Sequence, residues 1–263
     1  MTGLVFPVTD PVSKHMMQYD SIAQAYSDGK LSPLRRYVEA YSLFQLLGDV
    51  SGLRVLDLAC GDGIYSRRLM EAGAAEVVGV DISQGMIDIA IAQEQREQLG
   101  IEYVRSDAKD LAALPGFTER FDLIIGAYLL HYAPDETVLT EICTAVRQCL
   151  APGGRFVGIN ENPDQSLADF SGYAQYGFNK VACAPLLDAT PVNYSMVSGR
   201  ELINFTVYYF GRSAYARAFA AAGFVTANWL PLQFDPLGVE ECGAEYWDEY
   251  LNNPPVICLE LLP

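Results

Sequence analysis

The residues best suited to chemistry in this sequence stand where short apolar runs end. The first run leads into the segment Asp57-Leu58-Ala59-Cys60-Gly61-Asp62-Gly63. The second run ends at Asp81 and the third ends at Asp107. Glycines in such a loop let the backbone approach a ligand closely, because they carry no Cβ. A carboxylate at Asp81 can accept hydrogen bonds from both hydroxyls of a ribose, and one at Asp107 can accept a bond from the exocyclic amine of adenine. The three positions together predict a nucleoside site.

A dinucleotide is the alternative ligand for a loop of this kind, and two residues disfavour it. The dinucleotide pattern is G-x-G-x-x-G, and its third glycine would fall on Ser66. Asp62 also places a carboxylate where a pyrophosphate would have to sit. A cationic ligand, or one without phosphate, fits this acidic loop better. A nicotinamide-dependent oxidoreductase is therefore the alternative from a different class of enzyme.

Strands that alternate with helices are expected to position these residues. Apolar runs predict strands at 54–59, 76–81, 101–107, 121–128, 155–160, 224–230 and 256–262, and helical spacing predicts helices at 64–72, 83–99, 134–150, 213–222 and 240–251. This alternation favours an α/β fold with a parallel sheet and right-handed crossovers. Since ligands of such sheets bind at the carboxyl ends of the strands, the glycine loop, Asp81 and Asp107 should share one edge.

Two further segments flank or interrupt the alternation. Residues 1–50 are expected to form a helical cap or lid, in which Tyr19 and Tyr26 lie two helical turns apart on one face. Residues 51–263 are expected to form one domain with an insertion at about 163–211. Ten of the thirty aromatic residues fall between 170 and 215, which suggests that the insertion encloses an apolar or ring-bearing molecule. A small core of its own, or the interface of a homo-oligomer, would explain the same enrichment.

Composition argues against several other functions. The 263 residues are 51% hydrophobic and carry a formal charge of −16. Nucleic acids and anionic membranes bind to clustered basic residues, which this sequence lacks, so neither partner is expected. The longest apolar run has eight residues, whereas a membrane span needs about 20. The sequence shows no secretory signal, C-x-x-C pair or metal-ligand cluster, which predicts a cytoplasmic protein with reduced cysteines and no metal.

Five short motifs occur together between residues 55 and 160. They are Val55 to Gly63, Gly79-Val80-Asp81-Ile82-Ser83 with Met86, Ser106-Asp107-Ala108, Phe121-Asp122, and Leu150-Ala151-Pro152-Gly153-Gly154. As a set they resemble the class I S-adenosylmethionine-dependent methyltransferases, of the small-molecule type. The resemblance implies a Rossmann-like, mostly parallel sheet of seven strands with helices on both faces and an antiparallel last strand. Tyr19-Asp20-x-x-Ala23-x-x-Tyr26 and residues 158–163 point more weakly to methyltransferases of toxoflavin- and teleocidin-type biosynthesis.

The resemblance also implies which residues hold the cofactor, S-adenosyl-L-methionine. In the family the glycine loop lies along the methionine part, Asp81 holds the ribose, and Asp107 with Ala108 meets the adenine. Tyrosines of the N-terminal pattern close over the cofactor. The cofactor-binding residues expected on this basis are Tyr19, Tyr26, Asp57, Ala59, Gly61, Gly63, Asp81, Ile82, Met86, Asp107, Ala108, Ala127 and Tyr132.

Methyl transfer needs an aligned acceptor, and a base where the acceptor must lose a proton. The candidate catalytic residues are His131 and Tyr128, after the fourth predicted strand, and Glu161, after the fifth. A packing role for the histidine and a solvated loop position for the glutamate are the alternatives. The expected reaction is N- or O-methylation of a small ring-containing or apolar metabolite. Carbon methylation of an isoprenoid alkene is its rival, since aromatic rings can stabilise a carbocation without any base.

Overall fold

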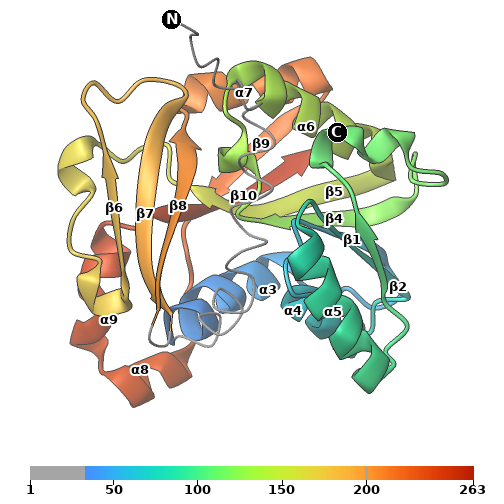
Figure 1. Ribbon diagram of the computed structural model, residues 1–263, viewed down its shortest axis with the longest axis horizontal. Helices are drawn as coiled ribbons and strands as arrows, with labels where there is room; N and C mark the ends of the chain where they lie inside the picture. Colours follow the sequence, from blue (N-terminus) through green and yellow to red (C-terminus); the bar gives the residue numbers. More distant parts are fainter. Residues whose placement is uncertain (1–32, 199–200) are drawn as a thin grey trace, which may run out of the picture.

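A seven-stranded sheet runs through the middle of the computed structural model, which describes residues 33–198 and 201–263 (Figure 1). The strand order is β3-β2-β1-β4-β5-β10-β9. Only β10 is antiparallel to its neighbours, β5 and β9. The strands are β1 (Arg54–Leu58), β2 (Glu76–Asp81), β3 (Glu102–Arg105), β4 (Phe121–Ala127), β5 (Leu150–Glu161), β9 (Thr226–Leu230) and β10 (Val256–Leu262). The predicted α/β fold is thereby confirmed, including its antiparallel last strand.

Helices cover both faces of this sheet (Figure 1). One face carries α3 (Tyr41–Leu47), α4 (Ile64–Glu71) and α5 (Gln84–Glu97), and the other carries α6 (Glu136–Cys149), α7 (Arg212–Ala222) and the short η2 (Ala108–Ala113). Each face has its own apolar core, one built around Leu43, Leu69 and Leu123 and the other around Leu56, Phe121 and Ile142. Strands covered on both faces are expected to be almost wholly apolar, as the buried residues of β4 are.

The insertion after β5 forms a second, antiparallel sheet in the order β6-β7-β8. Its strands are β6 (Phe178–Ala182), β7 (Thr190–Ser198) and β8 (Glu201–Tyr209), and two 3-10 turns, η4 (Leu167–Asp169) and η5 (Ala174–Tyr176), precede them. The register places Lys180 opposite Tyr194 and Tyr194 opposite Phe205. Since side chains alternate between the faces of a sheet, these three form one row on the same face. The sequence also suggests strands at 193–197 and 202–210; β7 extends beyond the first, β8 has the length of the second shifted by one residue, and β6 adds a third strand.

Three element boundaries differ from the sequence-based expectation for local reasons. Strand β5 begins at Leu150, because Leu150 already pairs with Phe121 ahead of an irregularity, after which Arg155 pairs with Leu123. The helix expected at 240–251 is two helices, α8 (Pro236–Cys242) and α9 (Ala244–Asn252), separated by Gly243 at φ +84°. The segment before α3 is a π-helical turn, η1 (Arg35–Ala40). Within the described ranges, no helix combines the length and the apolar character needed to cross a membrane, and His, Cys, Asp and Glu form no metal-binding group of three.

Candidate active site

The larger cavity lies at the carboxyl ends of β1, β2 and β4. The strand order reverses between β1 and β4, and open α/β sheets bind ligands at such a switch point. The space measures about 1400 Å³, including the part open to solvent. Nine of the predicted cofactor-binding residues line it: Ala59, Gly61, Asp81, Ile82, Met86, Asp107, Ala108, Ala127 and Tyr132.

Asp81 joins the glycine loop to the start of α5. One carboxylate oxygen accepts a hydrogen bond from the Gly61 N–H at 2.8 Å, and the other accepts one from the Ser83 N–H at 2.9 Å. Gly61 adopts φ +57°, a left-handed conformation that glycine reaches without a Cβ clash. Each carboxylate oxygen can accept a second bond. The carboxylate is therefore fixed by the backbone while it faces the cavity.

Asp57 and Gly63, the other residues predicted in the loop, shape it from beneath and do not line the cavity. Asp57 is buried and accepts a hydrogen bond of 2.6 Å from the Ser66 hydroxyl. Gly63 has φ +76°, and a Cβ at this position would overlap the Tyr103 ring. These two residues therefore position the loop's backbone. The predicted Tyr19 and Tyr26 lie outside the described residues.

Two other acids sit at the starts of helical turns around the same cavity. Asp107 precedes η2 and accepts a hydrogen bond of 3.2 Å from the Lys109 N–H. Asp62 is buried, and its carboxylate accepts a bond of 3.3 Å from the Ile64 N–H at the start of α4. The N-terminus of a helix is where a phosphate would otherwise bind. At α4 the chain's own carboxylate takes that place.

A second cavity adjoins the first beneath the inserted sheet. It measures about 580 Å³, including its open part, and shares Arg35, Tyr128 and Tyr132 with the larger one. Tyr128 adopts φ +65°, which is uncommon for a residue with a side chain. All three predicted catalytic residues line the second cavity: His131, Tyr128 and Glu161. Its aromatic residues are Tyr128, Tyr132, Tyr176, Phe178, Tyr194, Phe205 and Tyr250.

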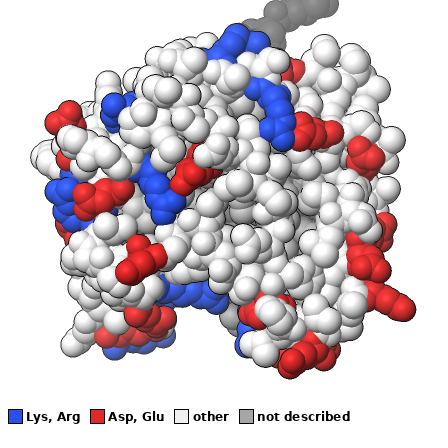
Figure 2. All heavy atoms as spheres, turned by 180° about the vertical axis from the view of Figure 1, so that it is seen from behind, with Lys and Arg blue, Asp and Glu red and all other residues white. Residues whose placement is uncertain are grey.

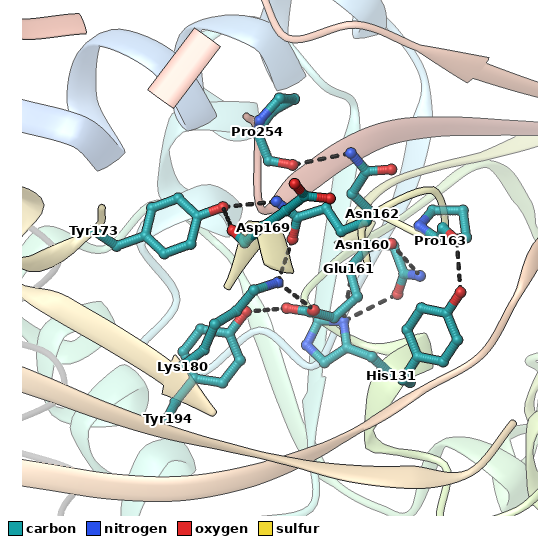
Figure 3. Close-up of polar contacts among 12 residues, drawn as sticks. His131, Asn160, Glu161, Asn162, Pro163, Asp169, Tyr173, Lys180, Tyr194 and Pro254 are labelled. Carbon is teal, nitrogen blue, oxygen red and sulfur yellow. Dashed lines mark hydrogen bonds and ion pairs between the residues drawn. The ribbon is translucent and has the colours of Figure 1, made fainter. Parts of the chain in front are cut away.

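The His131 ring is oriented by Asn160 of β5 (Figure 3), which is in turn bonded to Tyr215 of α7. Its Nδ1 lies 3.0 Å from the Asn160 side-chain oxygen, and the Asn160 Nδ2 donates to the Tyr215 hydroxyl at 2.6 Å. That amide orientation also turns Nδ2 toward the Glu161 carbonyl, at 3.4 Å. An oxygen facing Nδ1 requires the proton there, which leaves Nε2 as an acceptor. The Glu161 N–H lies 3.3 Å from Nδ1 and would favour the other tautomer, but that contact is longer.

Burial keeps the imidazole neutral. His131 is 2% exposed, and desolvation lowers its pKa below the ordinary value, against the opposing charge of Glu161. A histidine with a lowered pKa is unprotonated at pH 7. Geometry and charge therefore both give Nε2 the properties of a proton acceptor.

Glu161 lies in a buried network, in contrast to the solvated loop position considered from the sequence. Its Oε2 forms an ion pair with the Lys180 Nζ at 3.1 Å, and its Oε1 accepts the Tyr194 hydroxyl (Figure 3). Lys180 also donates to the Gln165 side chain at 2.5 Å, and its Nζ lies 4.1 Å from the centre of the Phe170 ring. Desolvation lowers the pKa of Lys180, while Glu161 opposes that shift. The inserted sheet is thus tied to β5 through a charged pair.

Three residues at the second cavity were not predicted from the sequence. Glu39 lines it, while Lys180 and Asn160 hold residues that line it. Lys180 occupies an inward position of β6, between two inward apolar residues, Phe178 and Ala182. A lysine at an inward position of an alternating strand is the one signal that could have marked it. Asn160 and Glu39 each follow an apolar residue, Ile159 and Val38, and only the tertiary structure brings them to the cavity.

Replacement of Lys180 by methionine should strongly destabilise the fold. The variant leaves the Glu161 carboxylate buried without its cation, a loss that costs about 3–5 kcal/mol. For a chain of this size this corresponds to a fall in melting temperature of roughly 6–20 °C, measured by differential scanning calorimetry.

The double variant Lys180→Met/Glu161→Gln should recover much of the lost stability, because no uncompensated charge remains. Arg217→Met, which breaks an exposed ion pair with Glu136, is the control and should shift melting far less. A single variant as stable as the wild type would contradict a stabilising role for this ion pair.

Comparison with known proteins gives consistent matches. A family model described as a methyltransferase domain matches residues 55–154. The ubiquinone biosynthesis O-methyltransferase of Coxiella burnetii is 32% identical over 177 residues, which cover 63% of this chain and 70% of that protein. The N-demethylindolmycin N-methyltransferase of Streptomyces griseus is 26% identical over 179 residues, which cover 67% and 72%.

The fold has a counterpart among solved structures. The crystal structure of an S-adenosylmethionine-dependent methyltransferase from Mesorhizobium loti aligns with a TM-score of 0.59 at 23% identity. The alignment covers 89% of this chain and 99% of the other. The alignment is therefore much longer than the segment that the family model matches.

Proposed function

Since the chain belongs to the S-adenosylmethionine-dependent methyltransferases, we propose that it transfers the methyl group of S-adenosylmethionine to a small acceptor held in the second cavity. The observation that carries this proposal is the junction of two cavities at Tyr128 and Tyr132. One has the features of a nucleoside site, and the other is aromatic and contains a neutral histidine. Two adjoining pockets are what a transfer between two bound molecules requires.

The larger cavity fits S-adenosylmethionine by the chemistry of its lining. The Asp81 carboxylate, already fixed by two backbone N–H groups, would hold the ribose hydroxyls. Asp107 and Ala108 would meet the adenine, with Ile82, Met86 and Ile142 as its apolar neighbours. The Ala59–Gly61 backbone would lie along the methionine part. When bound, the molecule supplies an electrophilic methyl group on a sulfonium.

The same site is poorly suited to a nicotinamide dinucleotide. Its pyrophosphate would require the N-terminus of α4, where the Asp62 carboxylate is bonded to the Ile64 N–H. A second anion there would be repelled by the first. This observation supports the methyltransferase over the oxidoreductase considered from the sequence.

The chain's own residues would contribute alignment, exclusion of water and a proton acceptor. In-line transfer gains much of its rate from holding the reacting atoms in position, and the rings around Tyr128 define that position. The inserted sheet covers the acceptor's cavity and limits its contact with water. The Nε2 of His131 would take the proton of an N–H or O–H acceptor.

A small-molecule acceptor and a cytoplasmic location are part of the same proposal. Figure 2 shows acidic and basic side chains interspersed on one face of the molecule, with no gathering of basic ones. Such a face offers little attraction for a polyanion. The acceptor cavity has the size and aromatic lining of small-molecule sites.

Calorimetry with two ligands tests the proposal directly. The purified protein should bind S-adenosylhomocysteine, the product left after transfer, and give no heat with NAD. Asp110→Ala serves as a control, because this acid is exposed and does not line the cavity. Binding of NAD without any response to S-adenosylhomocysteine would overturn the proposal.

A further inference from the structure

The second cavity contains a buried carboxylate with an unused hydrogen-bond acceptor. Glu39, at the end of η1, lines the cavity and is 4% exposed. Its Oε1 accepts a hydrogen bond of 3.4 Å from the Tyr250 hydroxyl, whereas its Oε2 has no hydrogen-bond partner among the described residues. A buried acceptor left without a donor is costly. A ligand that brings an N–H to this oxygen would remove that cost.

The position of Glu39 links it to the place of transfer. Glu39 lines the same cavity as Tyr128, and Tyr128 lines both cavities. A group bound to Glu39 would therefore lie beside the junction where the acceptor atom must be. Tyr176 and Tyr250 also line this cavity, and aromatic rings attract cations.

The charges around this space do not cancel the acidic character of Glu39. The Arg35 Nε lies 3.8 Å from Oε2, which is within ion-pair range and too long for a hydrogen bond. The other cation, Lys180, is engaged by Glu161 and Gln165 and does not line the cavity. The neighbouring imidazole of His131 is neutral. A cationic N–H donor would thus meet the Glu39 carboxylate and one partly engaged arginine, since Glu161 is already paired with Lys180.

From this geometry we propose that the acceptor is an amine attached to a ring-bearing body, and that Glu39 binds the nitrogen which receives the methyl group. The inference rests on the proposed methyl transfer and adds the acceptor class and its binding residue. An alkylamine is protonated at neutral pH, as the lysine side chain is, so it binds as an ammonium with Glu39 as partner. An alcohol of the same shape has no charge to offer and forms a weaker bond.

Matched pairs of amines and alcohols test the proposal. Dissociation constants are measured by calorimetry at pH 7.5, with the protein saturated by S-adenosylhomocysteine. The probes are 2-phenylethylamine against 2-phenylethanol, and tryptamine against indole-3-ethanol. Each amine should bind at least about 10-fold more tightly than its alcohol, because hydrogen bonds between ionised partners are roughly twice as strong as those between neutral ones. With S-adenosylmethionine, the amines should give N-methylated products by mass spectrometry.

The Glu39→Gln variant separates recognition from folding. Glutamine keeps the shape and the oxygen that accepts from Tyr250, but it removes the charge, so the amine and alcohol constants should converge to within about threefold. Affinity for S-adenosylhomocysteine and melting temperature should stay close to those of the wild type. The amine proposal is overturned if neither amine binds better than its alcohol, or if Glu39→Gln keeps the preference. Failure to bind S-adenosylhomocysteine would instead overturn the methyltransferase function itself.

Discussion

Replacement of Asp81 by alanine should weaken the binding of S-adenosylhomocysteine by about 10²–10⁴-fold. The carboxylate is expected to accept one charge-assisted hydrogen bond from each ribose hydroxyl, and each such bond contributes about 1.5–3 kcal/mol. Together they amount to about 3–6 kcal/mol, and each 1.4 kcal/mol is a factor of ten in affinity. Titration calorimetry of the wild type and the variant measures this ratio. Asp110→Ala, an exposed acid on η2, should leave it unchanged.

Part of the lost affinity for S-adenosylhomocysteine will result from a less ordered glycine loop, and not from the missing ribose contacts. A second variant separates the two contributions. Asp81 also accepts the Gly61 and Ser83 N–H groups, so alanine frees the glycine loop as well as the ribose site. Asp81→Asn keeps one accepting oxygen and should show an intermediate affinity with a melting temperature closer to the wild type. An alanine variant that melts early but binds with full affinity would show that Asp81 acts only on the loop.

Much of the lining of the larger cavity could be predicted from the sequence, for a physical reason. Its residues stand at the ends of β1, β2 and β3, and each strand is marked by a local apolar run. In a parallel sheet the end of a strand is also a place in space, since neighbouring strands present their carboxyl ends at one edge. The positions of Gly61, Asp81 and Asp107 therefore followed from local patterns. Asp57 belongs to β1 and Gly63 follows it in the loop, and only their packing against Ser66 and Tyr103 shows that they do not face the cavity.

For the second cavity, the sequence predicted only that its lining would be rich in aromatic residues. The aromatic enrichment of residues 170–215 indicated an enclosed cavity, but not which rings would face it. Tyr194 lines the cavity, while Tyr173 packs beside Tyr250 and donates to the Asn253 carbonyl. Glu39 and Lys180 lie in segments about 140 residues apart in sequence, and no local pattern joins a π-helical turn to an inserted strand. Lys180 reaches Glu161, and Glu39 comes to line the cavity beside Tyr128, only through the way the inserted sheet packs on the rest of the fold. That packing depends on the whole core.

His131 is the residue whose loss should affect turnover most if the acceptor carries a proton. His131→Ala should lower kcat by about 10²-fold or more, within the 10²–10⁴-fold typical of a general base. The affinity for S-adenosylhomocysteine should be unchanged, because the ring lines only the acceptor cavity. Imidazole added to the alanine variant should restore part of kcat by supplying the missing acceptor. A purely structural role for the ring would give no such rescue.

The pH profile gives the sign of the same effect. Burial lowers the pKa of His131, so the wild-type rate should fall on the acid side only below the ordinary value near pH 6.5. The free energy of unfolding should also decrease as the pH falls below about 6.5. The reason is that His131 has its higher, ordinary pKa in the unfolded chain, which therefore binds the proton more readily than the folded protein. His131→Ala should remove the acid limb that belongs to this group.

Asn160 offers the strictest test of how the base works. Asn160→Leu removes the oxygen that receives the Nδ1 proton, so the imidazole is free to place its proton on Nε2, where it can no longer accept one from the substrate. We expect kcat to fall toward that of His131→Ala while the affinity for the acceptor changes little. Asn160→Asp keeps an acceptor at that place and adds a negative charge, which should raise the pKa of His131 and move the acid limb of the rate profile to higher pH.

An ammonium bound at Glu39 has no lone pair until a proton leaves, so an amine acceptor makes turnover depend on this tautomer of His131. A kcat within about threefold of the wild type in both His131→Ala and Asn160→Leu would remove the base, and would favour carbon methylation or catalysis by alignment alone.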